Sequence, residues 1–511
     1  MLRCNSFLAV TSSVAVRQNR FDSLRKLGNA KAPTVRMTAL VAFLSVTAFI
    51  LRFHFTGIAY NHSDEPIAVG VVSGLLQRHT VDTNWAHFDL PAKFHYAQFN
   101  FSSYYLALAF FCELARDHSI KSMRLLSALL GALCVPLSFL LGKRLHSART
   151  GFFAALMTAF SPQLFFDSLF ARPDSFFALI YLIAILVAIS SPRNGTRIFI
   201  SSLLFGILAA CKISALFVAP IPLLLFLVNR EASDRYWRML ALSAAGVIAG
   251  FAAGAPYALL NPVDFVNGVL FLMGRYASGG GPLGLGDAPL YERLWYLAKF
   301  IIASIGPIAV LTSLYAYRRL SKEVLVIGSL SIISVLYLGS RGWFYERNFD
   351  HCLPVIYILA WIGISQLTEL FSSAHRGVIF ATLSTLALVP TAYFSYQLQY
   401  QILSGRYEKR VESYLARQSA AGANALVWPS IVYGDPLNAI RTYMKDKPLP
   451  MTVSFAWSDD QHAAKNISEF LNGYHAIKVD EIHDPFWLMP PCSIQAYVSM
   501  SYVTYRLSAR R

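Results

Sequence analysis

Residues 38–65 read TALVAFLSVTAFILRFHFTGIAYNHSDE, an apolar run from Thr38 to Gly57 that is followed by the adjacent acids Asp64 and Glu65. About 20 apolar residues are what a helix needs to cross a hydrocarbon core of about 30 Å. The acid pair therefore comes where the chain has just left a bilayer, and ionisable groups at such a position tend to be functional. We take the pair as a catalytic candidate. The alternative interpretation is a solvated turn, since polar residues and a proline surround the pair.

The composition extends this pattern to the whole chain. Of its 511 residues, 55% are hydrophobic and 14% are charged, which is more apolar surface than a soluble core needs. About a dozen apolar runs, Gly151–Phe170 and Leu294–Leu314 among them, approach bilayer-spanning length. The sequence predicts an all-α polytopic membrane protein with about 11 to 12 transmembrane helices. A β-barrel is excluded, because its strands would alternate polar and apolar residues over about ten positions.

The net charge of +16 does not indicate a nucleic-acid partner. The Lys and Arg residues fall in short loops between apolar runs, which is the pattern of membrane topology and not of a nucleic-acid groove. Every second loop is basic, so these loops are placed in the cytoplasm and the remaining loops outside. The short run Tyr104–Leu114 is interpreted as non-spanning, because one more crossing would invert all later loops. About 11 spans follow from this assignment.

Three regions are expected. Residues 1–37 form a basic cytoplasmic segment, although an Arg-rich leader also fits an organelle transit peptide. Residues 38–396 form the transmembrane domain, whose first outer loop is 58–100. Residues 397–511 form a small soluble α/β domain on the extracytoplasmic side, because charged residues become frequent there. Its patterns predict strands at Ala425–Val432, Met451–Phe455 and within Ile494–Tyr505, and helices at Pro436–Met444 and Asp460–Leu471.

Other polar and charged groups on the predicted outer side complete a candidate site. They are Lys93 and His95 in the first outer loop, Arg172 and Asp174 in an Arg-Pro-Asp turn, Lys212 between two apolar runs, and Arg347 ahead of a late span. Each has a structural explanation, because Asp174 suits a helix cap, Lys212 an extension to the bilayer surface, and Arg347 an ordinary charged loop. Together with the acid pair they describe a site that holds a phosphate and deprotonates a group beside it.

Several motifs occur in an order that is informative. They are Ser63-Asp64-Glu65 after the first span, RLLSALLG from Arg124, the basic hinge LGKRL from Leu141, Ser161-Pro162 with Arg172-Pro173-Asp174, the small-residue segment Gly206–Lys212, and Arg347 with Pro354. From Thr38 to about Tyr396 this order resembles the lipid-phosphate-sugar-dependent glycosyltransferases of the C-type (GT-C) membrane fold, specifically the protein mannosyltransferases and aminoarabinose transferases. The family commonly has His-Pro-Pro where this chain has His95 without the prolines.

The resemblance implies an inverting transfer of a hexose or pentose from a polyprenyl phosphate, dolichyl or undecaprenyl, to an acceptor hydroxyl on the outer or luminal face. It implies that Asp64 is the general base and that Glu65 positions hydroxyls. Lys212, Arg347 and Arg172 then bind the donor phosphate, and Asp174, His95 and Lys93 support the site or contact the acceptor. The acceptor is a protein, a lipid or a glycan. The membrane is a bacterial inner membrane or that of the endoplasmic reticulum.

No cofactor is required by this chemistry, because cations can neutralise the phosphate. A divalent metal is compatible with Asp64, Glu65 and Asp174 but is not demanded. The six cysteines include no close Cys-x-x-Cys pair, so they indicate neither a zinc site nor a disulfide framework.

Two other functions compete with the enzyme. A polytopic transporter or lipid flippase also has about a dozen spans and buried charges, but its polar groups gather at mid-membrane and its halves are often related. A non-catalytic membrane scaffold, whose soluble tail binds a partner, predicts that Asp64 is dispensable.

Overall fold

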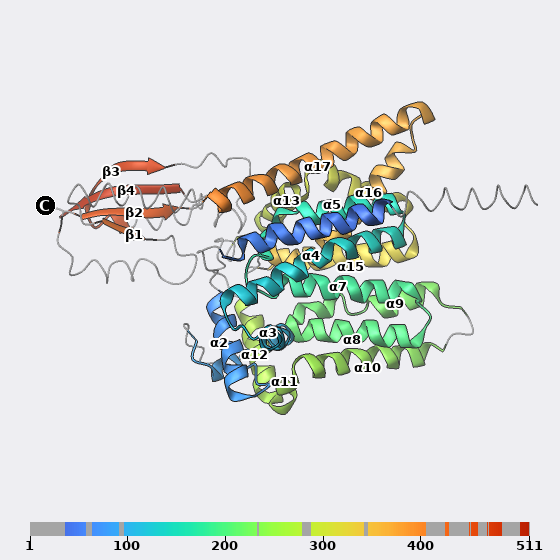
Figure 1. The fold of residues 1–511 in the computed structure, drawn as a ribbon, viewed down its shortest axis with the longest axis horizontal. Helices are drawn as coiled ribbons and strands as arrows, with labels where there is room; N and C mark the ends of the chain where they lie inside the picture. The colour runs from blue at the N-terminus through green and yellow to red at the C-terminus, as the bar shows by residue number, and fades with distance from the viewer. Residues whose placement is uncertain are drawn as a thin grey trace, which may run out of the picture.

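A computed structural model of the chain is a bundle of helices with a small β-sheet beyond one end (Figure 1). The structure describes residues 36–57, 64–90, 97–231, 235–277, 288–341, 346–404, 425–428, 449, 451–457, 468, 470–482 and 501–509. The helices are Arg36–His54, α2 Glu65–Arg78, α3 Ser102–Ala115, α4 Ile120–Leu145, α5 Ala148–Phe160, α6 Pro162–Asp167, α7 Asp174–Ser190, α8 Gly195–Cys211, α9 Ile221–Asn229, α10 Tyr236–Gly254, α11 Pro256–Leu260, α12 Pro262–Ala277, α13 Leu290–Ile305, α14 Pro307–Ala316, α15 Lys322–Gly339, α16 Leu353–Thr368 and α17 Ser373–Ser404.

Short 3₁₀ turns lie between several of these helices. They are η1 Phe55–Gly57, η2 Trp85–His87, η3 Ile213–Phe217, η4 Tyr317–Arg319 and η5 Glu346–Phe349.

The described helices have the lengths and composition of a membrane bundle. Five are long and apolar enough to cross a bilayer, or six if one bent pair counts as a single span, and six shorter apolar helices of 10–17 residues accompany them. The predicted all-α polytopic membrane fold is therefore confirmed. The prediction of about 11 spans stays a prediction, since length and composition alone identify these candidates.

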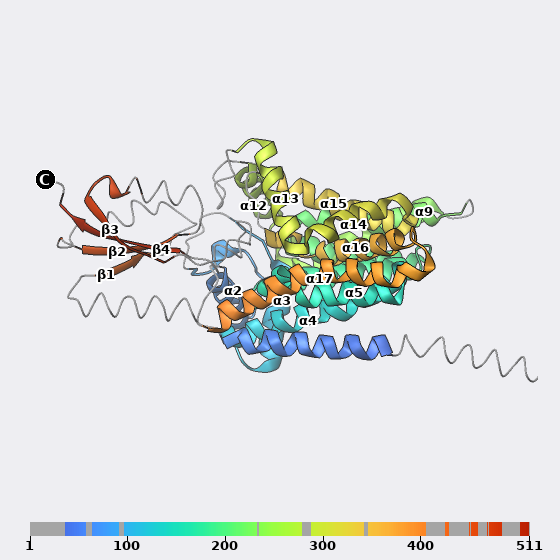
Figure 2. The same cartoon turned by 90° about the horizontal axis from the view of Figure 1, so that it is seen from above.

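The first span lies along one side of the bundle (Figure 2). The helix Arg36–His54 packs there through Val41 and Ala48, which join a buried cluster with Val135 and Phe139 of α4 and with α5. Because only 17% of its most apolar window is buried, the rest of this helix presents hydrophobic side chains outward, as a lipid-facing span does.

Two of the expected spans are interrupted, and in each case the sequence contains the reason. The run Gly151–Phe170 does not form one helix, because α5 ends at Phe160 and the Ser161 hydroxyl accepts a hydrogen bond from the Leu164 amide at 3.3 Å, which caps the new helix α6. The run Leu294–Leu314 breaks at Gly306, whose φ of 83° suits glycine, and Pro307 then begins α14. The two halves meet at a bend of 103°.

Small residues let α8 and α10 approach each other closely. A Cβ atom at Gly206 of α8 would collide with the Val247 carbonyl oxygen of α10, and a Cβ at Gly250 would collide with that of Leu203. Glycine at both positions therefore lets the two backbones approach, which is the usual way that helices associate in membranes.

The C-terminal region contains a four-stranded sheet in the order β1-β2-β4-β3. Its strands are β1 Ala425–Trp428, β2 Met451–Trp457, β3 His475–Ile482 and β4 Ser501–Ser508. β1 pairs with β2 in parallel, whereas β4 is antiparallel to both β2 and β3. Both views place the sheet beyond the end of the bundle that holds α2 and α12 (Figures 1 and 2).

The predicted strands of this region correspond to β1, β2 and β4, but β3 was not predicted. The predicted helix Pro436–Met444 and most of Asp460–Leu471 lie outside the described residues. The domain boundaries at residues 37 and 396 stay predictions.

Candidate active site

The adjacent acids Asp64 and Glu65 have different surroundings. The Asp64 side chain is 24% exposed, and its Oδ2 lies 2.7 Å from Nη1 of Arg347 and 4.0 Å from Nε of Arg172. Asp64 therefore keeps access to solvent while two cations, from distant parts of the chain, stabilise its charge. A group that must contact a substrate needs this kind of access.

Glu65 is buried in a fixed ion pair. Its Oε1 and Oε2 accept hydrogen bonds of 2.7 Å from Nε and Nη2 of Arg124, and both side chains are only 2% exposed. The Ala171 amide adds a third bond to Oε1 at 2.9 Å, and Arg124 donates to the Thr56 carbonyl at 3.2 Å. This bidentate geometry joins the start of α2 to α4 and to the segment before α7.

Arg172 lies at the centre of the acidic residues. Its Nη1 bonds Oδ1 of Asp167 at 2.8 Å, and its Nη2 lies 2.9 Å from Oδ2 of Asp174. Neither Nε nor Nη2 has a hydrogen-bond acceptor with good geometry among the described residues. Arg172 is thus a buried cation with donor capacity left over, and such capacity suits an anion.

Lys212 and Asp174 form a second buried contact. Lys212 Nζ lies 2.6 Å from Oδ1 of Asp174 and donates to Oδ1 of Asn348 at 3.3 Å. The ammonium also lies 5.9 Å from the Phe101 ring centre and 5.7 Å from that of Phe177. Lys212 is therefore held by the side chains of the cluster. Asp174 is the first residue of α7 and caps no amide with its side chain, so the capping explanation does not describe it.

The segment after α15 supplies several site residues at once. Arg347 and Asn348 belong to η5, Asp350 follows them, and His351 packs its ring 4.8 Å from Phe177. Asp350 is 2% exposed, and among the described residues no donor bonds either of its carboxyl oxygens. Burial lowers the pKa of His351 to about 3, so this imidazole is neutral at physiological pH.

Three contributors to the site were not predicted from the sequence: Asp167, Asn348 and Asp350. A buried cation outside the ion pairs of the cluster, Arg52, was not predicted either. Arg52 is 0% exposed and donates from Nε to the Ser168 hydroxyl at 2.8 Å. A lone cation inside the first apolar run is a signal that could have identified it. Asp350 had no comparable signal, because it follows other polar residues in a loop.

The structure brings together Asp64, Glu65, Arg172, Asp174, Lys212 and Arg347 from four segments of the chain. Lys93 and His95 lie outside the described residues. In the part of the chain that the structure describes, no group of three or more His, Cys, Asp or Glu side chains is arranged to hold a metal ion. The carboxylates of the site face cations instead, and the prediction that no cofactor is required stays a prediction.

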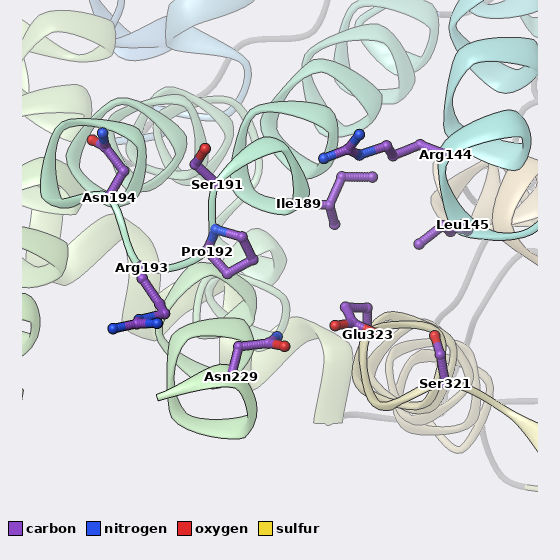
Figure 3. Close-up of a pocket in the computed structure, with 10 residues that line it drawn as sticks. All are labelled: Arg144, Leu145, Ile189, Ser191, Pro192, Arg193, Asn194, Asn229, Ser321 and Glu323. Atoms are coloured by element: carbon purple, nitrogen blue, oxygen red, sulfur yellow. The ribbon is translucent and has the colours of Figure 1, made fainter. Parts of the chain in front are cut away.

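A cavity of about 730 Å³ lies away from this cluster (Figure 3). Arg144 of α4, Asn229 of α9 and Glu323 of α15 line it together with the segment after α7. Asp174 begins α7 whereas the cavity adjoins its last turn, and 17 helical residues separate two points by about 25 Å. The cavity is therefore a separate feature of the opposite end of the bundle.

Comparisons with known proteins agree with this architecture. Residues 103–258 match the family described as dolichyl-phosphate-mannose-protein mannosyltransferase. The crystal structure of ArnT from Cupriavidus metallidurans bound to undecaprenyl phosphate is similar over 91% of this chain and 98% of its own, with a TM-score of 0.53 and 13% identity. A search of curated proteins found no match.

Two other structures align less well. The oligosaccharyltransferase AglB from Archaeoglobus fulgidus, in complex with an inhibitory peptide and a dolichol-phosphate, covers 72% of this chain and 56% of its own, with 14% identity and a TM-score of 0.47. The arabinofuranosyltransferase AftD from Mycobacteria covers 92% and 40%, with 14% identity and a TM-score of 0.45. The resemblance of this chain to the GT-C glycosyltransferases is confirmed, and the ArnT likeness shows the fold.

Proposed function

We propose that this chain, a multi-pass membrane protein of the GT-C fold, transfers a sugar from a polyprenyl phosphate to an acceptor hydroxyl. The family matched over residues 103–258 acts with a dolichyl-phosphate sugar, and the ArnT structure holds undecaprenyl phosphate. The observation that carries the proposal is the arrangement of Arg172, Lys212 and Arg347 around Asp64. It joins a solvent-accessible carboxylate to cations that suit a phosphate.

Asp64 acts as the general base. Among the acids of the cluster it is the most exposed, at 24%, whereas the side chains of Glu65, Asp167 and Asp174 are exposed by 2% or less. Arg347 holds the carboxylate in place, and a carboxylate oxygen can accept the proton of an acceptor hydroxyl. Attack by that hydroxyl opposite the leaving phosphate inverts the anomeric carbon.

Arg172, Arg347 and Lys212 stabilise the phosphate as it leaves. Negative charge grows on the phosphate in the transition state, and fixed cations in a site of low dielectric stabilise that charge strongly. The Nε donor of Arg172, which has no hydrogen-bond acceptor with good geometry among the described residues, is suited to a phosphate oxygen. Asp174 holds Arg172 and Lys212 at this position through its two oxygens.

Glu65 takes a different role from the one that the resemblance implies. Its two oxygens are occupied by Arg124, so we assign to it the placement of Asp64, its neighbour in sequence, and not the binding of hydroxyls. The acceptor, a protein, lipid or glycan, approaches Asp64 from the outer or luminal face of a bacterial inner membrane or of the endoplasmic reticulum. The C-terminal sheet lies beyond the same end of the bundle as α2, where it is available to that acceptor.

The proposal is tested by transfer of a radiolabelled sugar from dolichyl and undecaprenyl phosphate donors, in membranes that contain the native chain or Asp64→Asn. Expression and folding are matched, and Glu113→Gln is the control, because the Glu113 side chain is 70% exposed and pairs only at 3.7 Å with His118. We expect donor-dependent transfer by the native chain and by the control, and its loss in Asp64→Asn. Transfer that survives in Asp64→Asn removes Asp64 from the mechanism, and no transfer by the native chain from any donor favours a transporter.

A further inference from the structure

Asp350 is a buried carboxyl group that no cation of the site contacts directly. It lies in the connection between η5 and α16, is 2% exposed, and receives no hydrogen bond on either oxygen from the described residues. The turn η5, which directly precedes Asp350, packs against α6, whose last residue is Asp167, and this packing places the two carboxyl groups next to each other. Two carboxylates can only accept hydrogen bonds, so this contact is favourable when one of the two groups holds a proton.

Asp167 is the member of this pair that is already engaged as a carboxylate. Its Oδ1 accepts from Nη1 of Arg172 at 2.8 Å, and its Oδ2 accepts from the side-chain amide of Gln163. Both bonds require lone pairs and are strongest when Asp167 is ionised. The proton of the pair therefore belongs on Asp350.

The charges of the cluster lead to the same assignment. Three cations, Arg172, Arg347 and Lys212, are linked by ion pairs to three carboxylates, Asp64, Asp167 and Asp174. Asp350 is a fourth carboxyl group, and these three cations already have three carboxylates as partners. If it were ionised, the buried cluster would carry an excess negative charge at the proposed phosphate site, and an unpaired buried charge is costly.

We propose that Asp350 carries a proton which it donates to Asp167, and that this carboxyl pair is a positioning device that holds Arg172 ready for the donor phosphate. The positioning of Arg172 for a donor phosphate rests on the proposed function, whereas the protonation of Asp350 does not depend on that function. Because Asp350 touches neither reacting group, it acts through Asp167 and Arg172.

The pair also makes donor binding depend on pH. Burial, with the neighbouring charges of Asp167 and Asp174, raises the pKa of Asp350 well above its usual range. The proton is therefore present at neutral pH and is lost as the pH rises through that raised pKa. Other ionisable groups within electrostatic range come from the surrounding elements: Arg172 ahead of α7, Lys212 after α8, Cys134 on α4, and Cys352 and Tyr357 at α16.

The proton is tested directly by infrared spectroscopy of the purified full chain. A protonated carboxyl group has a C=O stretching band that a carboxylate lacks, and this band shifts on transfer to D₂O. We expect such a band at neutral pH in the native chain and in Glu113→Gln, its loss in Asp350→Asn, and its decline in the native chain as the pH is raised. A spectrum that Asp350→Asn leaves unchanged overturns the inference, whether or not the chain transfers sugar.

The positioning role is tested by transfer kinetics of Asp350→Ala and Asp350→Asn. Asp350→Ala removes the hydrogen-bond donor from Asp167, and we expect the donor KM to rise about ten-fold or more. Asp350→Asn keeps a neutral donor for Asp167, so we expect it to restore most of the transfer that alanine loses. We also expect it to abolish the alkaline loss of donor affinity that the inference predicts for the native chain. Equal impairment in both variants at every pH would mean that the Asp350 charge is needed, and it would overturn the role.

The two parts of the argument fail separately. If the native chain transfers no sugar, the proposed function is wrong, but the infrared band of the carboxyl pair is still expected. A native chain that transfers sugar without the band retains the function and removes the pair.

Discussion

The two ends of α7 hold charged residues in opposite ways. At its first residue, Asp174, three charged side chains meet with little access to water: Asp174 and Arg172 are exposed by 1% and 2%, and Lys212 by 12%. Beyond its last residue, Ser190, Arg193 pairs with Glu231, and their side chains are 40% and 66% exposed. The charges are of the same kinds, and what differs is the water around them.

This difference in solvent exposure indicates which charges are associated with function. Removing an ion from water costs several kcal/mol even in real proteins, and an ion pair does not always recover that cost. Exposed pairs cost little and contribute little. The buried charges near Asp174 therefore lower the stability of the fold, whereas the exposed pair of Arg193 and Glu231 hardly affects it. A costly arrangement of this kind supports placing the phosphate chemistry at the Asp174 end of α7. The following predictions test this contrast, in order of decreasing effect.

The largest effect is expected at the exposed carboxylate of the buried cluster. Asp64→Asn removes the proposed base while keeping its size and hydrogen-bonding oxygen, and general-base groups contribute about 10²- to 10⁴-fold to rate. We expect kcat for sugar transfer to fall by about that factor, with a small change in donor KM, because Asp64 acts on the acceptor. Steady-state kinetics with a polyprenyl phosphate donor measure both. A rise in donor KM at unchanged kcat would show instead that Asp64 serves only to hold its cations.

The Glu65–Arg124 pair should affect stability more than chemistry. Arg124→Gln leaves the Glu65 carboxylate buried without its cation, and breaking a buried pair in this way costs about 3–5 kcal/mol. Thermal unfolding in detergent, followed by circular dichroism, measures the loss. The double variant Glu65→Gln with Arg124→Gln removes both charges, so it should lose less than Arg124→Gln alone. If the double variant is as unstable as the single one, the uncompensated charge is not the cause.

Lys212 should affect donor affinity. Lys212→Met keeps an unbranched side chain one atom shorter and removes the charge, while Asp174 keeps Arg172 as a partner at 2.9 Å. Hydrogen bonds to charged groups are worth about 1.5–3 kcal/mol, so the donor KM should rise by about 10- to 100-fold. Competition by free polyprenyl phosphate provides a second measurement of the same affinity. An unchanged KM with lower stability would make Lys212 a structural partner of Asp174 only.

The sequence predicted most of the cluster but not its internal pairing. Asp64, Arg172, Asp174, Lys212 and Arg347 were recognised because ionisable residues at the ends of apolar runs are conspicuous. Their partners were not, since pairing depends on which helices become neighbours. The segments of Asp167 and Asp350 are far apart in sequence, and only the packing of α6 against η5 brings them together.

The errors in the spans have a local cause. The hydrophobicity of a whole apolar run does not indicate where a helix ends inside it. The apolar pattern of the sequence therefore predicted one span where the structure has α5 and α6, and one where it has α13 and α14. The signals were present as Ser161-Pro162 and Gly306-Pro307, since proline cannot continue a helix hydrogen-bond ladder and glycine accepts the positive φ. In the tail, β3 was missed because its alternation is short and a bulge between Lys478 and Asp480 interrupts it.

The smallest effect is expected at the other end of α7. Arg193→Gln removes one member of the exposed pair with Glu231, and pairs of this kind contribute about 0.2–1 kcal/mol. Thermal unfolding at low and at high salt should show a small loss that salt reduces, since ions screen exposed charges. Sugar transfer should not change, because Arg193 lies about 25 Å from Asp174 along α7. A loss of transfer comparable to that of Lys212→Met would contradict the contrast between the two ends of α7. Burial would then no longer distinguish the charges that act on the donor from those that do not.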